Sequence, residues 1–324
     1  MKNTFELSAL VLCYKPNLKK LIMTLKSLIY QKDVCMQIVI ADDGSEIDHF
    51  DDIKKFFEDN KFNDFVLVKN PKNVGTVNNC LTGVNKCKGT YLKGISPGAY
   101  LADENSLRTW LDYIKSHNLQ VCGSDYYCYH FNDEGKIEYT KNSLTPSIVG
   151  LSGYKLRFNY LLNNDIFLGA AVICDKDLFY KYLKIIENKV KYTEDNVYRM
   201  MAYSGENLGY FNQRTVIYEV GTGISTCNNA KWAKIIKQDF IETDELILTL
   251  PSKDKKLQKI YHKFCKLNLN WKNLKRNKYR FFYYFLINGL VLLKIRKRIN
   301  SRISSCKLPT AWLKKIGGEV TKSS

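Results

Sequence analysis

The first hundred residues alternate between short apolar runs and segments in which apolar residues recur every three or four positions. Ser8 to Tyr14 forms a short apolar run, which is typical of a buried strand, whereas the apolar residues of 18–30 fall on one side of a helix. The same alternation predicts further strands at 37–42, 64–70 and 90–96 and further helices at 51–60 and 77–87. Apolar strands interleaved with one-sided helices predict an α/β fold, a mostly parallel sheet covered by helices on both faces.

The remainder of the chain changes character twice. Residues 120–225 are less regular and contain an apolar run over 166–174. From about Ala230 the pattern becomes helical and increasingly basic. We therefore expect an α/β domain over 1–230, with halves 1–110 and 111–230, followed by a basic helical region over 231–324.

The net charge of +18 comes from the end of the chain. Residues 251–324 hold 20 of the 50 Lys and Arg residues but 2 of the 32 acids, so residues 1–250 are neutral overall. Within this region, 281–293 is an apolar and aromatic run, shorter than the roughly 18 to 20 residues that span a bilayer. An apolar block between basic flanks is typical of a helix at an anionic membrane surface. Its expected membrane contacts are Phe281, Phe282, Arg296, Lys297 and Arg298.

Two alternatives for this basic region stay open. The apolar block can pack against the α/β domain or against a second copy in a homodimer, with its charges merely solvated. A nucleic-acid partner is less favoured, because the apolar residues form one block and are not interleaved as a stripe with the basic ones.

The cysteines and the amino terminus bear on location. The ten cysteines include no Cys-x-x-Cys pair and no histidine at zinc-finger spacing, which favours reduced thiols over a metal cluster. The sequence MKNTFELSALVLCY lacks the segments of a signal peptide. We therefore expect a cytoplasmic protein, peripheral at the inner face of the plasma membrane through its basic region.

Polar residues gather where the predicted strands end. Ligands of parallel α/β sheets bind beyond the carboxyl ends of the strands, so these residues are the candidates for chemistry. The adjacent acids Asp42 and Asp43 repel each other and lose hydration unless a base edge, a ribose or a metal ion needs them. The same Asp-Asp-Gly-Ser sequence can instead form a turn and a helix cap, and the residues alone do not decide between the two.

Five ordered segments resemble the amino-terminal half of a family 2 glycosyltransferase with the GT-A fold. They are Cys13-Tyr14-Lys15-Pro16-Asn17, Ser27 to Gln31, Ile40 to Ser45, Asn73-Val74-Gly75 and Tyr91 to Ile95. The resemblance covers about residues 6–110. It is specific because the segments occur in the family's order and at its spacing.

The resemblance implies a nucleoside-diphosphate sugar as the donor. Tyr14 matches the residue that packs against the base, and Asp43 matches the acid that accepts from the base edge. Both Tyr14 and Gly75 also have structural explanations, as a strand-end ring and a turn glycine. The implied donor-binding residues also include Cys13 and Asp42 at the strand ends. Asn73 and Gly75 match the loop under the donor, and Asn79 matches a residue that faces the nucleotide. Lys93 is a candidate for neutralising charge, and Ser96 and Gly98 lie beside the expected diphosphate.

In the second half, Glu194-Asp195 matches the family's acidic pair near a helix start. The resemblance implies that Asp195 is the general base, because an inverting transfer needs a carboxylate to take the proton of the attacking hydroxyl. The same acids would also suit a helix amino terminus capped by Thr193. Gly169 and Ala170 match small residues that border the acceptor, and they can equally be packing residues.

The family's Asp-x-Asp motif holds a divalent cation, Mn²⁺ or Mg²⁺, against the diphosphate. Here the corresponding stretch is Ser96-Pro97-Gly98-Ala99, and Ala99 occupies the position at which similar sequences keep the metal-binding Asp. Three explanations stay open: replacement of the acid by design, a metal-independent enzyme, or a natural inactive member. Asp103 and Glu104 could substitute only if the loop turned back.

These features predict an inverting glycosyltransferase that moves a hexosyl or related sugar from a nucleoside-diphosphate donor to a glycan or lipid-linked acceptor. Richness in Lys, Asn, Ile and Tyr indicates an AT-rich bacterial genome, and hence assembly of a surface polysaccharide such as capsule or lipopolysaccharide. The alternative is a non-catalytic protein of the same fold that binds a nucleotide sugar or a glycan, because Ala99 replaces the metal-binding acid.

Overall fold

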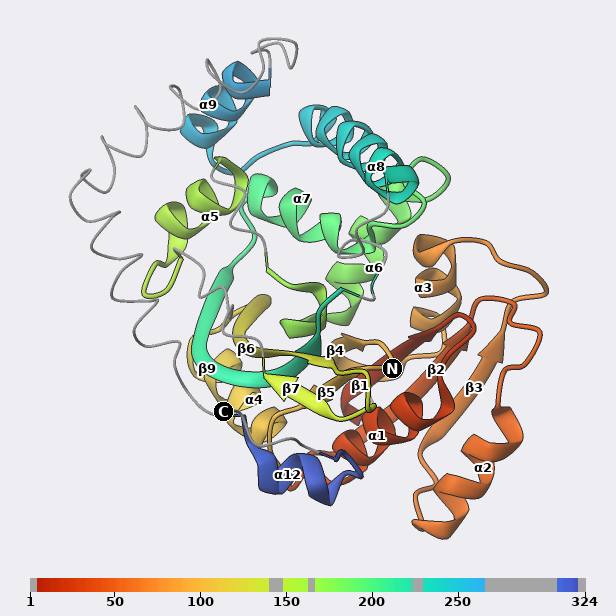
Figure 1. Ribbon diagram of the computed structural model, residues 1–324. Coiled ribbons are helices and arrows are strands. Elements are labelled where there is room, and N and C mark those ends of the chain that lie inside the picture. Colours follow the sequence, from red (N-terminus) through yellow and green to blue (C-terminus); the bar gives the residue numbers. More distant parts are fainter. Residues whose placement is uncertain are drawn as a thin grey trace.

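One mixed sheet organises the molecule (Figure 1). The computed structural model describes residues 5–139, 148–162, 167–221, 223, 230–265 and 308–319. Within these residues nine strands pair in the order β3-β2-β1-β4-β8-β6-β9-β5, and β7 pairs with β6.

The first four strands confirm the parallel sheet that the sequence predicts. They are β1 (Phe5–Cys13), β2 (Met36–Asp42), β3 (Phe65–Lys69) and β4 (Gly89–Ile95). Their pairings are parallel, with Cys13 opposite Asp42 and Asp42 opposite Lys69. The carboxyl ends of these strands therefore meet at one edge of the sheet.

The strands of the second half are β5 (Ala99–Leu101), β6 (Val121–Phe131), β7 (Ile137–Tyr139), β8 (Val172–Asp175) and β9 (Leu208–Glu219). β8 lies antiparallel between β4 and β6, whereas β9 runs parallel to β6 and antiparallel to β5. Because Ala99 pairs with Tyr218, the carboxyl end of β9 lies beside the turn that precedes β5.

The described part of the apolar run, residues 167–174, is not one continuous strand. Gly169–Ala171 forms a 3-10 turn, η1, and β8 begins only at Val172. The carbonyl of Ala170 accepts a hydrogen bond from the amine of Lys93, so this carbonyl is engaged outside a strand ladder.

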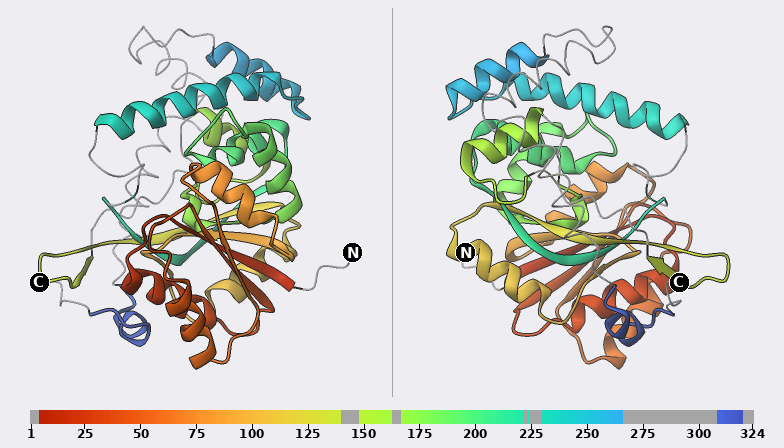
Figure 2. Two further views of the ribbon diagram at one scale, coloured as in Figure 1. Left: turned by 90° about the vertical axis from the view of Figure 1, so that its right-hand side faces the viewer. Right: turned by 60° about the vertical axis from the view of Figure 1, so that its left-hand side comes forward.

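Helices cover both faces of the sheet, as Figure 1 and Figure 2 show. One face carries α1 (Leu18–Ile29), α2 (Phe50–Asp59), α4 (Ser106–Ser116) and α12 (Thr310–Lys315). The other carries α3 (Thr76–Val84), α5 (Gly153–Leu162), α6 (Lys176–Ile186) and α7 (Val197–Ser204), and α8 (Ala230–Thr249) and α9 (Lys255–Cys265) pack on the outer side of these helices. The buried apolar side chains divide accordingly into two main clusters, one under each helical layer.

The described part of the region after residue 230 packs onto the α/β domain. Ile247 of α8 and Tyr261 of α9 are buried in the same cluster as residues of α5 and α7. On the opposite face Trp312 of α12 donates from Nε1 to the carbonyl of Leu101 at 2.7 Å. No helix in the described ranges combines the length and the apolar character that crossing a membrane requires. The expected membrane contacts Phe281, Phe282, Arg296, Lys297 and Arg298 lie outside the described residues.

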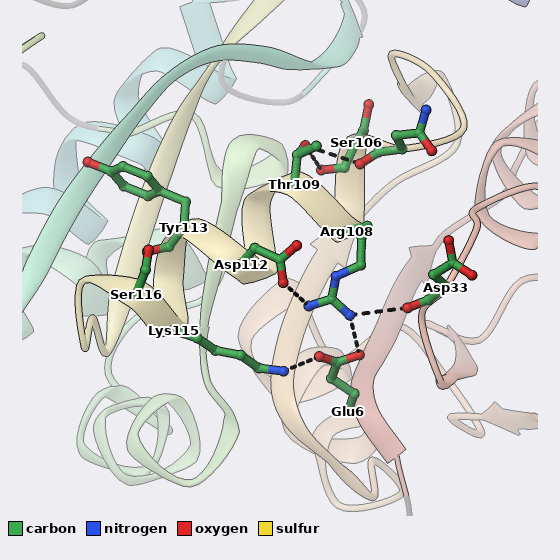
Figure 3. Close-up of polar contacts among 10 residues, drawn as sticks. Glu6, Asp33, Ser106, Arg108, Thr109, Asp112, Tyr113, Lys115 and Ser116 are labelled. Carbon is green, nitrogen blue, oxygen red and sulfur yellow. Dashed lines mark hydrogen bonds and ion pairs between the residues drawn. The ribbon is translucent and has the colours of Figure 1, made fainter.

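The amino end of β1 carries a cluster of ion pairs with α4 (Figure 3). Glu6 accepts from Nη1 of Arg108 at 3.0 Å and also from the amine of Lys115. Arg108 donates in addition to the carbonyl of Asp33 at 3.1 Å and to the carboxylate of Asp112 at 2.5 Å. At this edge the acids Glu6 and Asp112 are therefore paired with cations, and the pairs tie α4 to the sheet.

Candidate active site

A cleft of about 440 Å³ lies at the carboxyl ends of the parallel strands. The ends of β1 and β2 and the first turn of α3 form one wall, and residues 192–195 form the other; the first turn of α1 meets the end of β9 where Lys20 pairs with Glu219. The cleft brings together residues that the sequence predicts from both halves: Cys13, Tyr14, Asp43, Asn79, Ser96, Gly98, Ala99, Glu194 and Asp195.

Tyr14 presents its ring to the cleft directly after β1. The residue is 50% exposed, whereas Cys13 is buried and its thiol pKa is raised by that burial. The backbone after the ring is fixed, because the N–H of Lys15 donates to Oγ of Ser45 at 2.7 Å. An exposed aromatic ring on a fixed turn is suited to stacking against a planar base.

The adjacent acids Asp42 and Asp43 lie in different surroundings. Asp42 accepts from the N–H and from Oγ of Ser45, both at 2.7 Å, so it closes the turn after β2. Asp43 lines the cleft and accepts from the N–H groups of Val74 at 2.8 Å and Gly75 at 3.0 Å. Burial nevertheless raises the pKa of Asp43. Of the two acids, Asp43 is the one that a ligand in the cleft can reach.

Gly75 joins the two walls of the cleft. Its φ of +88° is in the left-handed region, and a Cβ here would lie 2.8 Å from the carbonyl oxygen of Lys191, so glycine alone fits. The next turn reinforces this contact, because the N–H of Val77 donates to the same carbonyl at 3.1 Å. The loop that binds Asp43 is thus joined to the segment that leads to Glu194.

Asn79 and Asn73 occupy unlike positions. Asn79 is buried in the cleft wall, where Nδ2 donates to the carbonyl of Ala41 at 3.0 Å and Oδ1 accepts from Asn70 at 2.9 Å. Asn73 is exposed and does not line the cleft. Its backbone packs closely against Gly44, where a Cβ would lie 2.8 Å from the nitrogen of Asn73.

Glu194 and Asp195 lie in a 3-10 turn, η2 (Glu194–Asn196), that leads into α7. Asp239 of α8 holds the preceding segment by accepting from the N–H of Tyr192 at 2.7 Å. Burial raises the pKa of both carboxyls, and repulsion from Asp195 raises the pKa of Glu194 further. Neither acid takes part in an ion pair with another described residue. A carboxyl with a raised pKa is suited to accepting a proton.

A smaller cavity of about 70 Å³ adjoins Asp195 and is also lined by Gly169, Ala170 and Ser96. A Cβ on Gly169 would lie 3.3 Å from the Cβ of Asp195, closer than most side chains approach. The small residues therefore keep space open beside the carboxyl, at the place where the sequence predicts the acceptor.

Lys93 lies beneath the cleft and lines neither cavity. Its side chain is fully buried, and its amine donates to the carbonyls of Gly94, at 2.7 Å, and Ala170. Burial lowers the pKa of Lys93 to about 7. In this position the amine holds the η1 turn against β4.

Side chains from two other elements fix the Ser96-Pro97-Gly98-Ala99 turn. Thr24 donates from Oγ1 to the carbonyl of Ala99 at 3.0 Å, and Tyr129 donates from its hydroxyl to the carbonyl of Gly98 at 2.7 Å. Gly98 has a φ of +97°, and a Cβ here would lie 2.7 Å from Oε2 of Glu219. The turn is therefore built closely around the carboxylate of Glu219.

Lys20 and Glu219 are cleft residues that the sequence did not reveal. Nζ of Lys20 lies 2.6 and 2.7 Å from the two carboxylate oxygens of Glu219. The residues are 199 positions apart, so no local pattern connects them. The one local indication is Lys20 itself, because it lies in the first turn of a helix, where the helix dipole disfavours a cation.

The residues at this turn do not fit a divalent cation. Ala99 offers no side-chain ligand, and a metal ion at Glu219 would lie beside the ammonium of Lys20. The described ranges contain no group of three His, Cys, Asp or Glu side chains that could hold a metal ion. Asp103 and Glu104 do not line the cleft either. Glu104 pairs with two lysines, and Asp103 accepts from Asn105 and Ser106.

Residues 8–183 match the family model described as glycosyl transferase family 2. The matched range contains the strand ends that form the first wall of the cleft, and it ends before Glu194. No curated protein matched the chain.

Solved structures with the same fold include two glycosyltransferases. TarS of S. aureus superposes with a TM-score of 0.58 at 15% identity, over 95% of this chain and 50% of that one, so this chain spans half the length of TarS. TarS 1–349 in complex with UDP-GlcNAc gives 0.54 at 13%, over 92% and 90%. The mannosyltransferase PcManGT from Pyrobaculum calidifontis, in complex with GDP-Man and Mn²⁺, gives 0.58 at 11%, over 96% and 84%. At such identities the likeness confirms the GT-A fold alone.

Proposed function

Because this chain belongs to glycosyl transferase family 2, we propose that it transfers a sugar, with inversion, from a nucleoside-diphosphate donor to a hydroxyl of a glycan or lipid-linked acceptor. One observation carries the proposal: a single cleft holds Tyr14 and Asp43 on one wall and Asp195 on the other. The first two provide a ring and a carboxylate for a base. Asp195 provides a proton acceptor beside the space that Gly169 leaves open.

The chemistry assigns a role to each wall. The acceptor hydroxyl attacks the anomeric carbon opposite the diphosphate, and the new C–O bond forms as the bond from the anomeric carbon to the phosphate oxygen breaks. The hydroxyl proton passes to the carboxylate of Asp195, and the bonding electron pair leaves with the nucleoside diphosphate. Glu194 beside it adds negative charge, which favours proton transfer onto the pair.

We further propose that the protein acts in the assembly of a bacterial surface polysaccharide, at the inner face of the plasma membrane. Nucleotide-sugar complexes of TarS and PcManGT support the donor class. The composition of residues 251–324, with 20 cations against 2 acids, supports contact with an anionic membrane. A homodimer formed through the same region is the competing explanation of that composition.

The proposal is tested by offering the full chain a panel of UDP-, GDP-, CDP-, ADP- and dTDP-sugars. Binding is followed by thermal shift, and release of nucleoside diphosphate is followed with and without glycan acceptors. We expect one nucleotide class to bind and its diphosphate to be released faster with acceptor present. Binding without release under any condition would instead support the non-catalytic alternative that Ala99 suggests, and the absence of any binding would exclude both.

A further inference from the structure

The ion pair of Lys20 and Glu219 lies at the turn where the family would place a metal ion. Glu219 reaches the turn from the end of β9, and its Oε2 occupies the space that a side chain at position 98 would need. Lys20 reaches it from the first turn of α1. Both residues line the cleft together with Ser96, Gly98 and Ala99.

The two members of the pair are unequally exposed. The side chain of Glu219 is 6% exposed and that of Lys20 is 24% exposed, so Lys20 is the more accessible member of the pair. The centroid of the Phe131 ring lies 4.8 Å from Nζ of Lys20, so the ring face also attracts the ammonium. Glu219 therefore holds the cation at the cleft wall and does not remove it from the cleft.

The ion pair with Glu219 accounts for Lys20 within the fold, whereas the helix dipole does not favour a cation at this position. The first turn of α1 contains no acid, although the positive end of the helix dipole favours an acid and disfavours a lysine there. A lysine ammonium has three N–H donors and can therefore bond a phosphate oxygen while keeping its contact with Glu219.

We infer that Lys20, positioned by Glu219, supplies the positive charge against the donor's diphosphate in place of a divalent cation, so that this chain binds its donor without metal. The inference rests on the proposed function, since it concerns the same cleft. It explains why Ala99 can stand where the family keeps an acid: an ammonium needs no Asp-x-Asp pair. The charge of the leaving nucleoside diphosphate is then stabilised by a side chain of the chain itself.

The first test compares binding of UDP, GDP, CDP, ADP and dTDP to the full chain in EDTA and in Mn²⁺ by titration calorimetry. We expect the nucleotide that binds to do so in EDTA with an affinity within about twofold of that in Mn²⁺, because the ammonium is already in place. A gain of about tenfold or more on adding Mn²⁺ would overturn the inference and leave the proposed function standing. If no nucleoside diphosphate binds in either buffer, the proposed function fails as well.

The second test removes the charge. We expect Lys20→Met to weaken binding of the nucleoside diphosphate by about tenfold or more and to leave binding of the corresponding nucleoside unchanged. Lys19→Met is the matched control, since Lys19 is exposed on the same helix turn and does not line the cleft. Equal diphosphate binding by the two variants would overturn the inference.

Lys20→Met also leaves Glu219 buried without its cation, which can lower stability. The double variant Lys20→Met/Glu219→Gln removes both charges, and its folding is checked by circular dichroism and urea unfolding. We expect the double variant to fold and to show the same selective loss of diphosphate binding. Recovery of wild-type affinity in the double variant would show that Lys20 only neutralises Glu219.

Discussion

The acids near the two ends of β1 differ in their partners: Glu6 at the amino end forms ion pairs, whereas Asp43 and Asp195 in the cleft at the carboxyl end form none with another described residue. At the amino end, Glu6 lies between Arg108 and Lys115, and the contacts of Glu6 and Arg108 join opposite charges or a charge and a carbonyl (Figure 3). At the carboxyl end, Asp43 is held by backbone N–H groups, and Asp195 has no ion pair with another described residue.

The difference separates charge that stabilises the fold from charge that is kept for a ligand. Burial raises the pKa of Asp43, Glu194 and Asp195, so the folded protein holds these carboxyls in an environment that disfavours their ionised form. Such positions lower stability, and clusters of them in a cleft are typical of functional sites. Lys20 and Glu219 are intermediate, because they form a complete ion pair that nevertheless lines the cleft.

The largest expected effect is on the rate when Asp195 is changed to Asn. The amide has nearly the same shape but cannot accept the proton, so we expect kcat to fall by about 10³-fold with little change in donor affinity. Release of nucleoside diphosphate at saturating donor and acceptor measures it. Glu6→Gln, at the opposite end of β1, should keep the wild-type rate. A rate for Asp195→Asn within about tenfold of wild type would assign the base elsewhere.

The next effect separates the two adjacent acids at the end of β2. We expect Asp43→Asn to weaken nucleotide binding by about tenfold, because it replaces a charged acceptor in the cleft by an amide. Asp42→Asn should instead lower the free energy of unfolding by about 1 to 3 kcal/mol, since it disturbs two buried bonds to Ser45.

Calorimetric titration of the nucleotide and urea unfolding measure these two quantities on the same variants. The assignment of roles is wrong if Asp42→Asn loses as much nucleotide affinity as Asp43→Asn while its free energy of unfolding stays at the wild-type value.

The local features of the fold and the cleft can be predicted from the sequence. The parallel strands and their ends follow from apolar runs only a few residues long, and these runs bring Tyr14 and Asp43 to one edge. The order of residues within Asp42-Asp43-Gly44-Ser45 did not show which acid closes the turn. That choice depends on the loop at Val74 and Gly75, which supplies the N–H groups that hold Asp43.

Contacts between residues far apart in the chain cannot be predicted in the same way. Lys20 and Glu219 meet only because β9 runs antiparallel to β5 and ends beside the turn before it. The same holds for Asp239, which fixes Tyr192 from a helix that the sequence assigns to the basic region. The η1 turn ahead of β8 is likewise held from a distant position, because the amine of Lys93 donates to the carbonyl of Ala170. Nothing in the local pattern predicts these contacts.

The smallest expected effect is on stability, and it has opposite signs for Glu194 in the cleft and Glu6 at the amino end of β1. Because the pKa of Glu194 is raised in the folded protein, the folded state binds its proton more tightly than the unfolded state does. The free energy of unfolding therefore falls as the pH rises above the ordinary carboxyl range. Glu194→Gln removes this loss, so we expect it to stabilise the protein by about 1 kcal/mol or more at pH 8 and by less at pH 5.

The matched variant Glu6→Gln should act in the other direction. It weakens charge-assisted bonds from Arg108 and Lys115, so we expect a loss of about 0.5 to 1 kcal/mol that shrinks at high salt. Urea unfolding of both variants at the two pH values, in low and high salt, measures the difference. If Glu194→Gln destabilises the protein at pH 8 as Glu6→Gln does, then the carboxyl of Glu194 serves the fold in the same way as the ion pairs at the amino end, and the distinction between the two edges fails.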